Sequence, residues 1–458
     1  MKTYTFPRAS CKTPQGGERT AWEGGRQKQY PEKCFEMELI RGKLLTLTEP
    51  HTEPPIPMQV NPLQIVTQFA HVLQQELFPE LESSVGPLSE ELKLLAAVVS
   101  MAPLELMLSA RRADTGRPAK DRAALATAFM AKAVMNIPTT RDLISRLRVD
   151  TALRRFCGWY GVGALPHESK FSRAFAEFAA TELPQQLHAA VIEATQRERI
   201  IGHITRDSTA IPARESVPES LRQEKKAKKE QKNKERKRTA KQGKRKRAKG
   251  AFAKAKATER GPRITRQRHQ KLDQMIKDLP LQCDIGAKTN SQGNQQFWRG
   301  YKLHLDVADG QLPISAILTS ASVHDSQVAI PLMTLTSQRV VHLYELMDSA
   351  YDADDIHAHS RQLNHVPIIA PHPRRGTKKS SQLPKVFPDR PTPQLDWAEQ
   401  ERYKIRTMSE RVNARLKDEF GASQIRVRGA AKIMAHLMFG VIALTVDQWL
   451  RLSSPLVS

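Results

Sequence analysis

Hydrophobic residues recur with a helical period along the first half of the chain. Helices are expected in five segments, at 61–110, 116–136, 139–157, 167–183 and 184–200. In the third segment, Thr139 or Thr140 and then Asp150 offer side-chain oxygens that can cap two short helices. Each segment carries its apolar residues on one face, so residues 61–198 are predicted to form an all-α domain.

After residue 199 the pattern changes to short β-rich runs. These runs lie at 200–211, 297–307, 313–319, 340–347 and 366–370. Pro212 ends the first run, and Asp309-Gly310 is a hairpin-turn signal between the second and the third. Asp284 to Lys288 is expected to be a polar loop, and helices are expected at 326–337 and 352–363. Strands interspersed with helices predict an α/β domain over residues 199–450.

The C-terminal part contains two helical patterns. The stretch 401–419 has no Gly or Pro and predicts one continuous helix. At about 100° per residue, one face of that helix would carry Tyr403, Arg406, Glu410, Asn413 and Lys417, and another face Ile405, Met408, Val412 and Leu416. The charge pattern alone is also typical of a solvated helix. Residues 429–451 predict an apolar helix that packs in a core and does not span a membrane.

Composition narrows the class of protein. The chain has 458 residues and a net charge of +24, from 72 basic and 48 acidic residues. This length predicts two or three domains, and the charge favours a polyanionic partner, nucleic acid before an anionic membrane. No run is apolar enough for a transmembrane helix, and residues 1–60 are expected to be a poorly ordered leader without a secretory signal. Four scattered cysteines indicate a cytoplasmic protein without a zinc or disulfide framework.

Basic residues are concentrated in one low-complexity run, 222–256, inside an expected insertion at 215–270. The run holds eighteen Lys or Arg and three Glu, and repulsion between like charges predicts an extended or transiently helical segment. Candidate DNA contacts in it are Arg236, Lys237, Arg238, Arg245, Lys246 and Arg247. A solvated linker is the alternative. A second Pro-rich basic loop is expected at 371–396.

Two aspartates occupy positions that are typical of functional sites. Asp207 lies within an apolar β-rich run, where an unpaired carboxylate is costly and requires a metal ion or an arginine. Asp348 directly follows the apolar run 340–347, at the carboxyl end of a strand, where sites in α/β folds form. Pairing of Asp207 with a neighbouring basic residue is the alternative interpretation. His324-Asp325 is expected to cap the helix at 326–337 and is less typical of a catalytic pair.

The order Tyr403-x2-Arg406-x3-Glu410-x6-Lys417 resembles the signature of bacterial insertion-sequence transposases of the DDE type. The resemblance implies a ribonuclease-H-like domain, a mixed five-stranded sheet with flanking helices, over residues 199–450. It also implies that Asp207, Asp348 and Glu410 form a catalytic triad that holds two Mg²⁺ ions, with Mn²⁺ as an alternative. Tyr403, Arg406 and Lys417 would then position the end of the mobile element.

The chemistry of phosphodiester cleavage supports the same residues. Two Mg²⁺ ions about 4 Å apart can activate a water, stabilise the leaving oxygen and neutralise the charge that develops. Such hard cations prefer carboxylate oxygens, whereas cysteine or imidazole selects other metals. Trp298 is a candidate for stacking on a base, and a Trp that packs in the hairpin or core is the alternative.

The N-terminal helices complete the expected DNA-binding surface. Helix, turn and helix with basic side chains between Arg141 and Arg173 is consistent with a helix-turn-helix-like domain at 61–198, or with a plain helical bundle. The resulting hypothesis is a cytoplasmic, nucleoid-associated transposase. It would bind terminal inverted repeats in double-stranded DNA as a homodimer, cleave them and transfer the 3′-end. A metal-dependent nuclease or resolvase on the same fold, or a catalytically inactive DNA-binding protein, are the alternatives.

Overall fold

The helices of the first half form where the apolar period indicates them. The computed structural model describes residues 77–109, 121–242, 263–289, 293–371 and 395–453. The helices before the sheet are α3 (Phe78–Val85), α4 (Glu90–Met101), α5 (Leu104–Ser109), α6 (Arg122–Val134), α7 (Thr140–Val149), α8 (Thr151–Phe156), η2 (Val162–Ala164), α9 (Glu168–Ala180) and α10 (Leu183–Gln196). The expected leader 1–60 lies outside the described residues.

Capping side chains fix where two of these helices begin. Thr139 accepts from the backbone N–H of Asp142, and Asp142 accepts from the N–H of Thr139, so α7 starts with a complete capping box. Asp150 accepts from the N–H of Leu153 and caps α8. Both predicted caps are confirmed. Arg154, expected on a basic surface, is buried instead and donates to the backbone carbonyls of Leu147 and Arg148.

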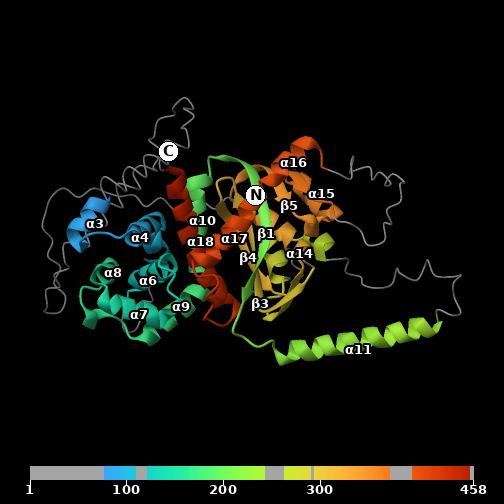
Figure 1. Ribbon diagram of the computed structural model, residues 1–458, viewed down its shortest axis with the longest axis horizontal. Helices are drawn as coiled ribbons and strands as arrows, with labels where there is room; N and C mark the ends of the chain where they lie inside the picture. Colours follow the sequence, from blue (N-terminus) through green and yellow to red (C-terminus); the bar gives the residue numbers. More distant parts are fainter. Residues whose placement is uncertain (1–76, 110–120, 243–262, 290–292, 372–394, 454–458) are drawn as a thin grey trace, which may run out of the picture. The chain divides into compact units, whose positions relative to one another are not determined.

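The second half is built on a mixed sheet (Figure 1). Its strands are β1 (Ile200–Pro212), β2 (Asp284–Thr289), β3 (Gln295–Ala308), β4 (Leu312–Ser320), β5 (Val341–Met347) and β6 (Val366–Ile369). The order is β2-β3-β1-β5-β6, with β4 paired to β3. β1 runs antiparallel to β3 and parallel to β5, which is parallel to β6. The sheet therefore has six strands, not the five that were predicted.

The sixth strand comes from the segment predicted to be a polar loop. Asp284 to Thr289 forms β2, which pairs with the first part of β3 and extends it as a hairpin. β3 changes partners at Gly300, whose φ of +149° is in the range that favours glycine. A Cβ there would lie 2.7 Å from the backbone N of Ala213. This close approach lets one long strand serve both the hairpin and the main sheet.

Helices cover both sides of the sheet (Figure 1). The additional helices are α12 (Arg263–Gln267), α13 (Leu272–Lys277), α14 (Ser326–Ser337), η3 (Ser349–Tyr351), α15 (Asp354–Gln362), α16 (Trp397–Lys404), α17 (Thr407–Asp418) and α18 (Ala430–Ser453). Ile330 and Met333 of α14 pack with Met347 and Ile369 of the sheet in one core cluster. Helix α17 lies against β1 and β3 on the other side.

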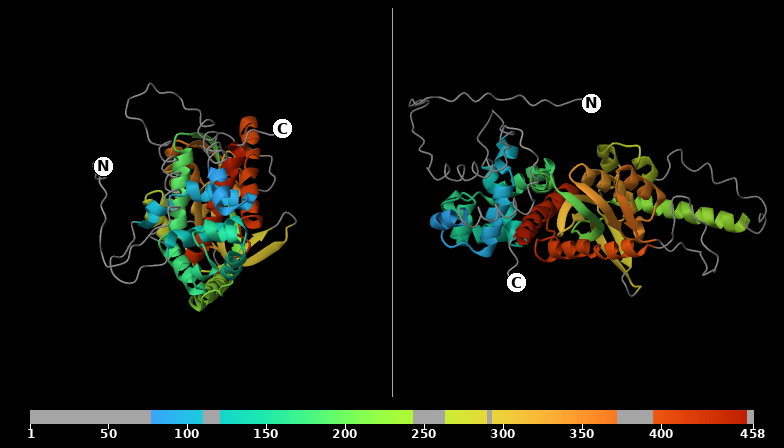
Figure 2. Two further views of the ribbon diagram at one scale, coloured as in Figure 1. Left: turned by 90° about the vertical axis from the view of Figure 1, so that its left-hand side faces the viewer. Right: turned by 90° about the horizontal axis from the view of Figure 1, so that it is seen from above.

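Helix α18 belongs to two layers at once. Its Trp449 packs with Ile201 and Ile314 of the sheet, and its Phe439 stacks on Phe129 of α6, with ring centroids 6.1 Å apart. Figure 2 shows this red helix between the teal helices and the strands. Ala430–Leu452 is long and apolar enough to cross a membrane, but 67% of its most apolar window is buried inside the protein. The prediction of a core helix agrees with this burial.

The basic insertion contains a long helix. α11 spans Glu219–Gln242 between β1 and α12, and its described side chains from Arg222 to Gln231 are exposed. The prediction of an extended or transiently helical segment, made for 222–256, is therefore wrong for residues 222–242. Pairs one turn apart, such as Lys228 with Glu224, offset part of the repulsion between the lysines. Near the sheet, Lys225 pairs with Asp284 of β2.

Candidate active site

Asp207 and Asp348 are brought together by two neighbouring parallel strands. The paired residues of β1 and β5 run from Ile200 with Val341 to Thr205 with Leu346. Two residues further along each strand are Asp207 and Asp348, so the two carboxylates are level with each other. β5 ends at Met347 while β1 continues to Pro212. The two side chains therefore come together at the carboxyl end of β5, beside the part of β1 that extends past that end.

The carboxylate of Asp207 is held in a mostly buried position. Asn413 of α17 donates from Nδ2 to its Oδ2 over 3.2 Å, and the backbone N–H of Ser208 also donates to it. Burial raises the pKa of Asp207 to about 6, and the negative charge of Asp348 adds to this effect, while Lys288 and Arg406 act in the opposite direction. A pair of carboxylates with this repulsion is a place where a cation gains electrostatic energy.

Asp348 is oriented by the turn that follows β5. Its Oδ1 accepts from the N–H of Ala350 over 2.9 Å, which makes Asp348 the N-cap of the short helix η3. Burial raises the pKa of Asp348, the Ala350 hydrogen bond lowers it, and the charge of Asp325 raises it further. The predicted position of Asp348, at the carboxyl end of a strand, is confirmed by the bounds of β5.

The signature segment is not one continuous helix. α16 ends at Lys404 and α17 begins at Thr407, with a turn at Ile405 and Arg406 between them. Tyr403 therefore lies in the last turn of α16, Arg406 is the N-cap of α17, and Glu410 is in the first turn of α17. The absence of Gly and Pro does not reveal this break, because the turn is made by residues with ordinary helical dihedral angles.

The break brings Tyr403, Arg406 and Glu410 into contact. The Arg406 guanidinium lies 5.6 Å from the centroid of the Tyr403 ring, and its Nη2 donates to Glu410 Oε1 over 2.8 Å. Arg406 is thus placed between the Glu410 carboxylate and the Asp207 charge, which both raise the pKa of Arg406 against the effect of its burial. Tyr403 is within electrostatic range of both Asp348 and Glu410.

Glu410 does not join the two aspartates as closely as they join each other. Its side chain is 54% exposed and is engaged with Arg406. Among the described residues, the group of His, Cys, Asp or Glu side chains whose ligand atoms all lie within 4.8 Å of one another is His342, Glu345 and His365. The three predicted carboxylates do not form such a group. Glu410 is nevertheless one turn before Asn413, the residue of α17 that contacts Asp207.

The donor set suits a hard divalent cation. Asp207, Asp348 and Glu410 offer only oxygen ligands, and Asn413 contributes a buried Oδ1 that has no hydrogen-bond partner. This unpaired oxygen belongs to the residue whose amide nitrogen contacts Asp207. The residues present therefore fit a Mg²⁺ or Mn²⁺ site.

Positive side chains surround the carboxylates. Lys417 of α17 and Lys288 of β2 both interact electrostatically with Asp207, as Arg406 does. Arg406 and Lys417 thus both approach Asp207, although the segment that carries them is not one continuous helix. Lys288 was not singled out from the sequence, because β2 was expected to be a loop. Its position opposite Gln296 on the hairpin becomes visible only once the β2–β3 register is known.

Asp325 is a further carboxylate near this site that the sequence interpretation assigned to a helix cap. It is the N-cap of α14, but its side chain makes no capping bond. Instead its Oδ1 accepts from Lys302 Nζ over 2.8 Å, and the Ser208 side chain donates to it. The neighbouring His324 accepts from the N–H of Ser326 over 3.4 Å. The predicted capping role is therefore wrong for Asp325 and weakly fulfilled by His324.

The other predicted DNA contacts lie away from the carboxylates. The Trp298 indole donates from Nε1 to the carbonyl of Tyr301 over 2.9 Å and covers Gly286 across the hairpin, so it packs as a hairpin residue. Arg236, Lys237 and Arg238 fall in α11, although their side chains are not described. Arg245, Lys246 and Arg247 lie outside the described residues. Stacking of Trp298 on a base and DNA contact by the basic residues stay predictions.

Two family models match the chain. A model described as a transposase DDE domain matches residues 202–446, which include all of the carboxylates above. A second model, described as a transposase domain (DUF772), matches residues 79–177 within the N-terminal helices. No curated protein and no solved structure matches the chain.

Proposed function

This chain belongs to the transposase DDE domain family, and from that membership we propose that it moves a bacterial insertion sequence. It binds the terminal inverted repeats of its element in double-stranded DNA, cleaves the DNA and transfers the freed 3′-end to a target. The carrying observation is the alignment of Asp207 with Asp348 on adjacent parallel strands, next to the helix that bears Glu410. In this proposal the sheet and its flanking helices are a ribonuclease-H-like catalytic domain.

Asp207, Asp348 and Glu410 are the residues that would hold the divalent ions. Two Mg²⁺ ions supply Lewis-acid stabilisation of the phosphate oxygens and lower the pKa of a bound water. The protein's own part is to fix the carboxylates. Asn413 and the Ser208 N–H hold Asp207, and the Ala350 N–H holds Asp348. Glu410, half-exposed on the first turn of α17 and paired with Arg406, would complete the ligand set.

The cations beside the carboxylates would position the DNA. Arg406 offers a planar set of donors to phosphate oxygens, and Lys417 and Lys288 offer compact charges. Once a phosphate engages Arg406, the Glu410 carboxylate loses its partner at 2.8 Å and becomes free to serve as a ligand. DNA binding and completion of the acidic site are coupled by this exchange. Tyr403, which lies against Arg406, helps to orient the guanidinium.

The remaining basic surface would supply affinity without sequence preference. Helix α11 presents a row of exposed lysines that can replace counterions on the DNA backbone. The helix-turn-helix-like part, residues 61–198, would read the terminal repeats, and a homodimer would pair the two ends. A protein with these partners works in the bacterial cytoplasm, on the nucleoid.

The proposal is tested by DNA cleavage with labelled element ends and Mg²⁺. Asp207→Asn, Asp348→Asn and Glu410→Gln should each reduce cleavage strongly. The loss should exceed the roughly 10–100-fold that is typical when a residue that only supports a metal ligand is replaced. Near-normal cleavage by any one variant removes that residue from the triad. Joining of the labelled end to plasmid separates a transposase from a nuclease or resolvase. DNA binding without any Mg²⁺-dependent product by the wild-type chain would favour an inactive DNA-binding protein.

A further inference from the structure

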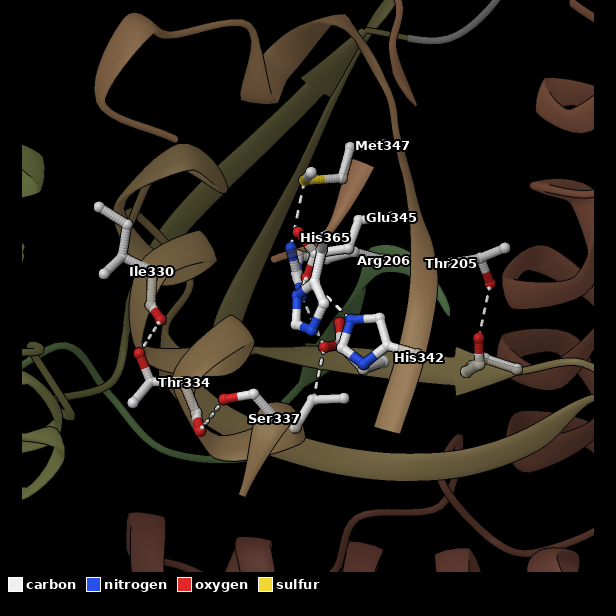
Figure 3. Close-up of polar contacts among 12 residues, drawn as sticks. Thr205, Arg206, Ile330, Thr334, Ser337, His342, Glu345, Met347 and His365 are labelled. Atoms are coloured by element: carbon white, nitrogen blue, oxygen red, sulfur yellow. Dashed lines mark hydrogen bonds and ion pairs between the residues drawn. The ribbon is translucent and has the colours of Figure 1, made fainter. Parts of the chain in front are cut away.

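A second group of possible ligands lies inside the sheet domain, apart from the oxygen-only site. His342 and Glu345 belong to β5, and His365 directly precedes β6. One ligand atom from each of the three lies within 4.8 Å of the other two. All three side chains are buried, at 2%, 0% and 8% exposure. Figure 3 shows both imidazole rings directed toward the Glu345 carboxylate.

From this geometry we propose that His342, Glu345 and His365 bind a divalent transition-metal ion, with zinc as the best fit. Three protein ligands of this kind leave one position of a tetrahedron open. The ion would link β5 to the start of β6. Its ligand Glu345 is three residues before Asp348, which belongs to the oxygen-only site. The proposal does not rest on transposition, since it concerns a site that is separate from the DNA-facing carboxylates.

The distances agree with a common ion. Nε2 of His342 lies 3.3 Å and Nδ1 of His365 lies 3.7 Å from the same oxygen, Oε1 of Glu345. Ligand atoms placed about 2.1 Å from one tetrahedral ion are about 3.4 Å apart. The two imidazole rings are tilted by 33° with centroids 3.6 Å apart. One nitrogen of each ring lies within 4.8 Å of a nitrogen of the other, so both rings can reach a common ion.

Unpaired polar atoms provide a second, independent observation. Oε2 of Glu345 and Nδ1 of both histidines are buried and have no hydrogen-bond partner. Buried polar groups are rarely left in this state, because an unmade hydrogen bond costs about 1–3 kcal/mol. An ion bound by Nε2 of His342, Oε1 of Glu345 and Nδ1 of His365 would give the unpaired Nδ1 of His365 a partner.

The buried charges around this group also favour a further cation. Arg206 is a permanently charged group beside Glu345, with its Nη2 3.5 Å from Oε1 of Glu345. The same nitrogen is closer to Asp306, at 2.7 Å, and Asp306 also accepts from Thr336. Two buried carboxylates thus share one guanidinium. A metal ion would supply the missing positive charge on the side of Glu345 that faces the histidines.

The choice of metal follows from the ligands. Two imidazoles and one carboxylate are typical of zinc, whereas Mg²⁺ prefers oxygen ligands and usually keeps several waters. The same chain would then hold two kinds of cation at separate places. Mg²⁺ would bind at the carboxylates of Asp207 and Asp348. Zinc would bind at the buried side chains of His342, Glu345 and His365.

The experiment measures zinc in the full-length chain, purified without a histidine tag and with dialysis against buffer. Elemental mass spectrometry should find about one zinc per chain. His342→Gln and His365→Gln should each retain little of it after dialysis, because loss of a ligand weakens binding by more than the roughly 10–100-fold that loss of an outer-shell partner costs. His357→Gln is the matched control, because His357 pairs with Asp352 and belongs to no such group. Asp348→Asn should also keep its zinc.

A titration keeps the proposal falsifiable if a variant fails to fold. Wild-type chain is stripped with a zinc-selective chelator in the presence of Mg²⁺, and its melting temperature should fall by about 5 °C or more, then recover with added zinc. Cobalt added to the stripped chain should give the visible absorption of a tetrahedral site. Stripped, folded wild-type chain that takes up no more zinc than the double variant His342→Gln/His365→Gln would overturn the site.

Discussion

Asn413 of α17 donates a hydrogen bond of 3.2 Å to the carboxylate of Asp207 in β1. This single contact joins two segments that are 206 residues apart in the sequence, one carrying the first predicted acidic residue and the other the last. The helix that bears Glu410 is therefore aligned with the strand that bears Asp207 before any ligand binds.

Removal of this hydrogen bond should reduce DNA cleavage. Asn413→Ala loses one hydrogen bond to a charged group, worth about 1.5–3 kcal/mol, so cleavage should fall by roughly 10–100-fold. Asn413→Asp should fall further, because a third negative charge would face Asp207. Cleavage rates at saturating Mg²⁺ measure both. Ala414→Gln, on the exposed side of the same helix, is the control and should be unaffected.

The raised pKa of Asp207 predicts how folding stability depends on pH. Burial raises the pKa of Asp207 in the folded protein to about 6, above its value of about 3.9 in an unfolded chain. The folded state therefore binds the proton more tightly, and the stability this provides is present below about pH 4 and lost as pH rises through 6.

Urea unfolding between pH 4 and 7, without added divalent metal, measures this dependence. Asp207→Asn should remove a large part of the decline, because the amide carries no charge to bury. An identical decline in the variant would contradict the assigned pKa. Mg²⁺ added at pH 7 should stabilise the wild-type chain and not Asp207→Asn, by binding to the folded state alone.

Arg206 predicts a large effect on stability without any contact to DNA. Its guanidinium is 1% exposed and lies between Asp306 and Glu345, which are both fully buried. Arg206→Met would leave both carboxylates without their cation, which typically costs about 3–5 kcal/mol. The free energy of unfolding in urea measures the loss.

A neutral partner provides the control for this prediction. The double variant Arg206→Met and Asp306→Asn should regain part of the lost stability, since the carboxylate closest to the guanidinium is then replaced by a neutral amide. A loss below about 1 kcal/mol for Arg206→Met alone would mean that the guanidinium does not hold β1, β3 and β5 together.

The salt dependence of DNA binding tests the basic helix. Neutralising Arg236, Lys237 and Arg238 should lower the slope of log affinity against log salt by up to about 0.9 for each phosphate that the protein no longer neutralises. The effect should be the same for element ends and for random duplexes. Arg197→Gln removes one exposed charge that is paired with Glu193 at the end of α10, and should leave the slope unchanged. An unchanged slope in the triple variant would exclude this part of α11 from the interface.

Local patterns in the sequence were sufficient for much of the secondary structure. The caps at Thr139 and Asp150, the strand that ends at Pro212 and the position of Asp348 after β5 follow from side chains close in sequence. The spacing of Tyr403, Arg406, Glu410 and Lys417 led to the family to which the chain belongs. Periodicity and capping are short-range effects, so a single sequence carries them.

Contacts between distant segments account for what the sequence missed. β2 is a strand because β3 pairs with it, and Lys288 comes close to Asp207 only through that pairing. The turn at Ile405 and Arg406 divides a stretch whose composition favours one helix, and it lets Arg406 reach both Tyr403 and Glu410. Asp325 precedes a helix, so its local sequence favours a cap. Its actual partner, Lys302, lies 23 residues earlier, and the sequence alone does not show that contact.

The amino-acid sequence by itself determined which residues carry charge, where most helices and strands form, and which acidic residues could bind a hard cation. Tertiary structure alone decided which of these residues meet. It placed Asp207 level with Asp348 through the register of two parallel strands and set Arg206 between two buried carboxylates. It also brought His342, Glu345 and His365 together where β5 lies next to β6. The physical reason is that propensity acts over a few residues, whereas strand register and the burial of charge are settled only when remote segments pack together.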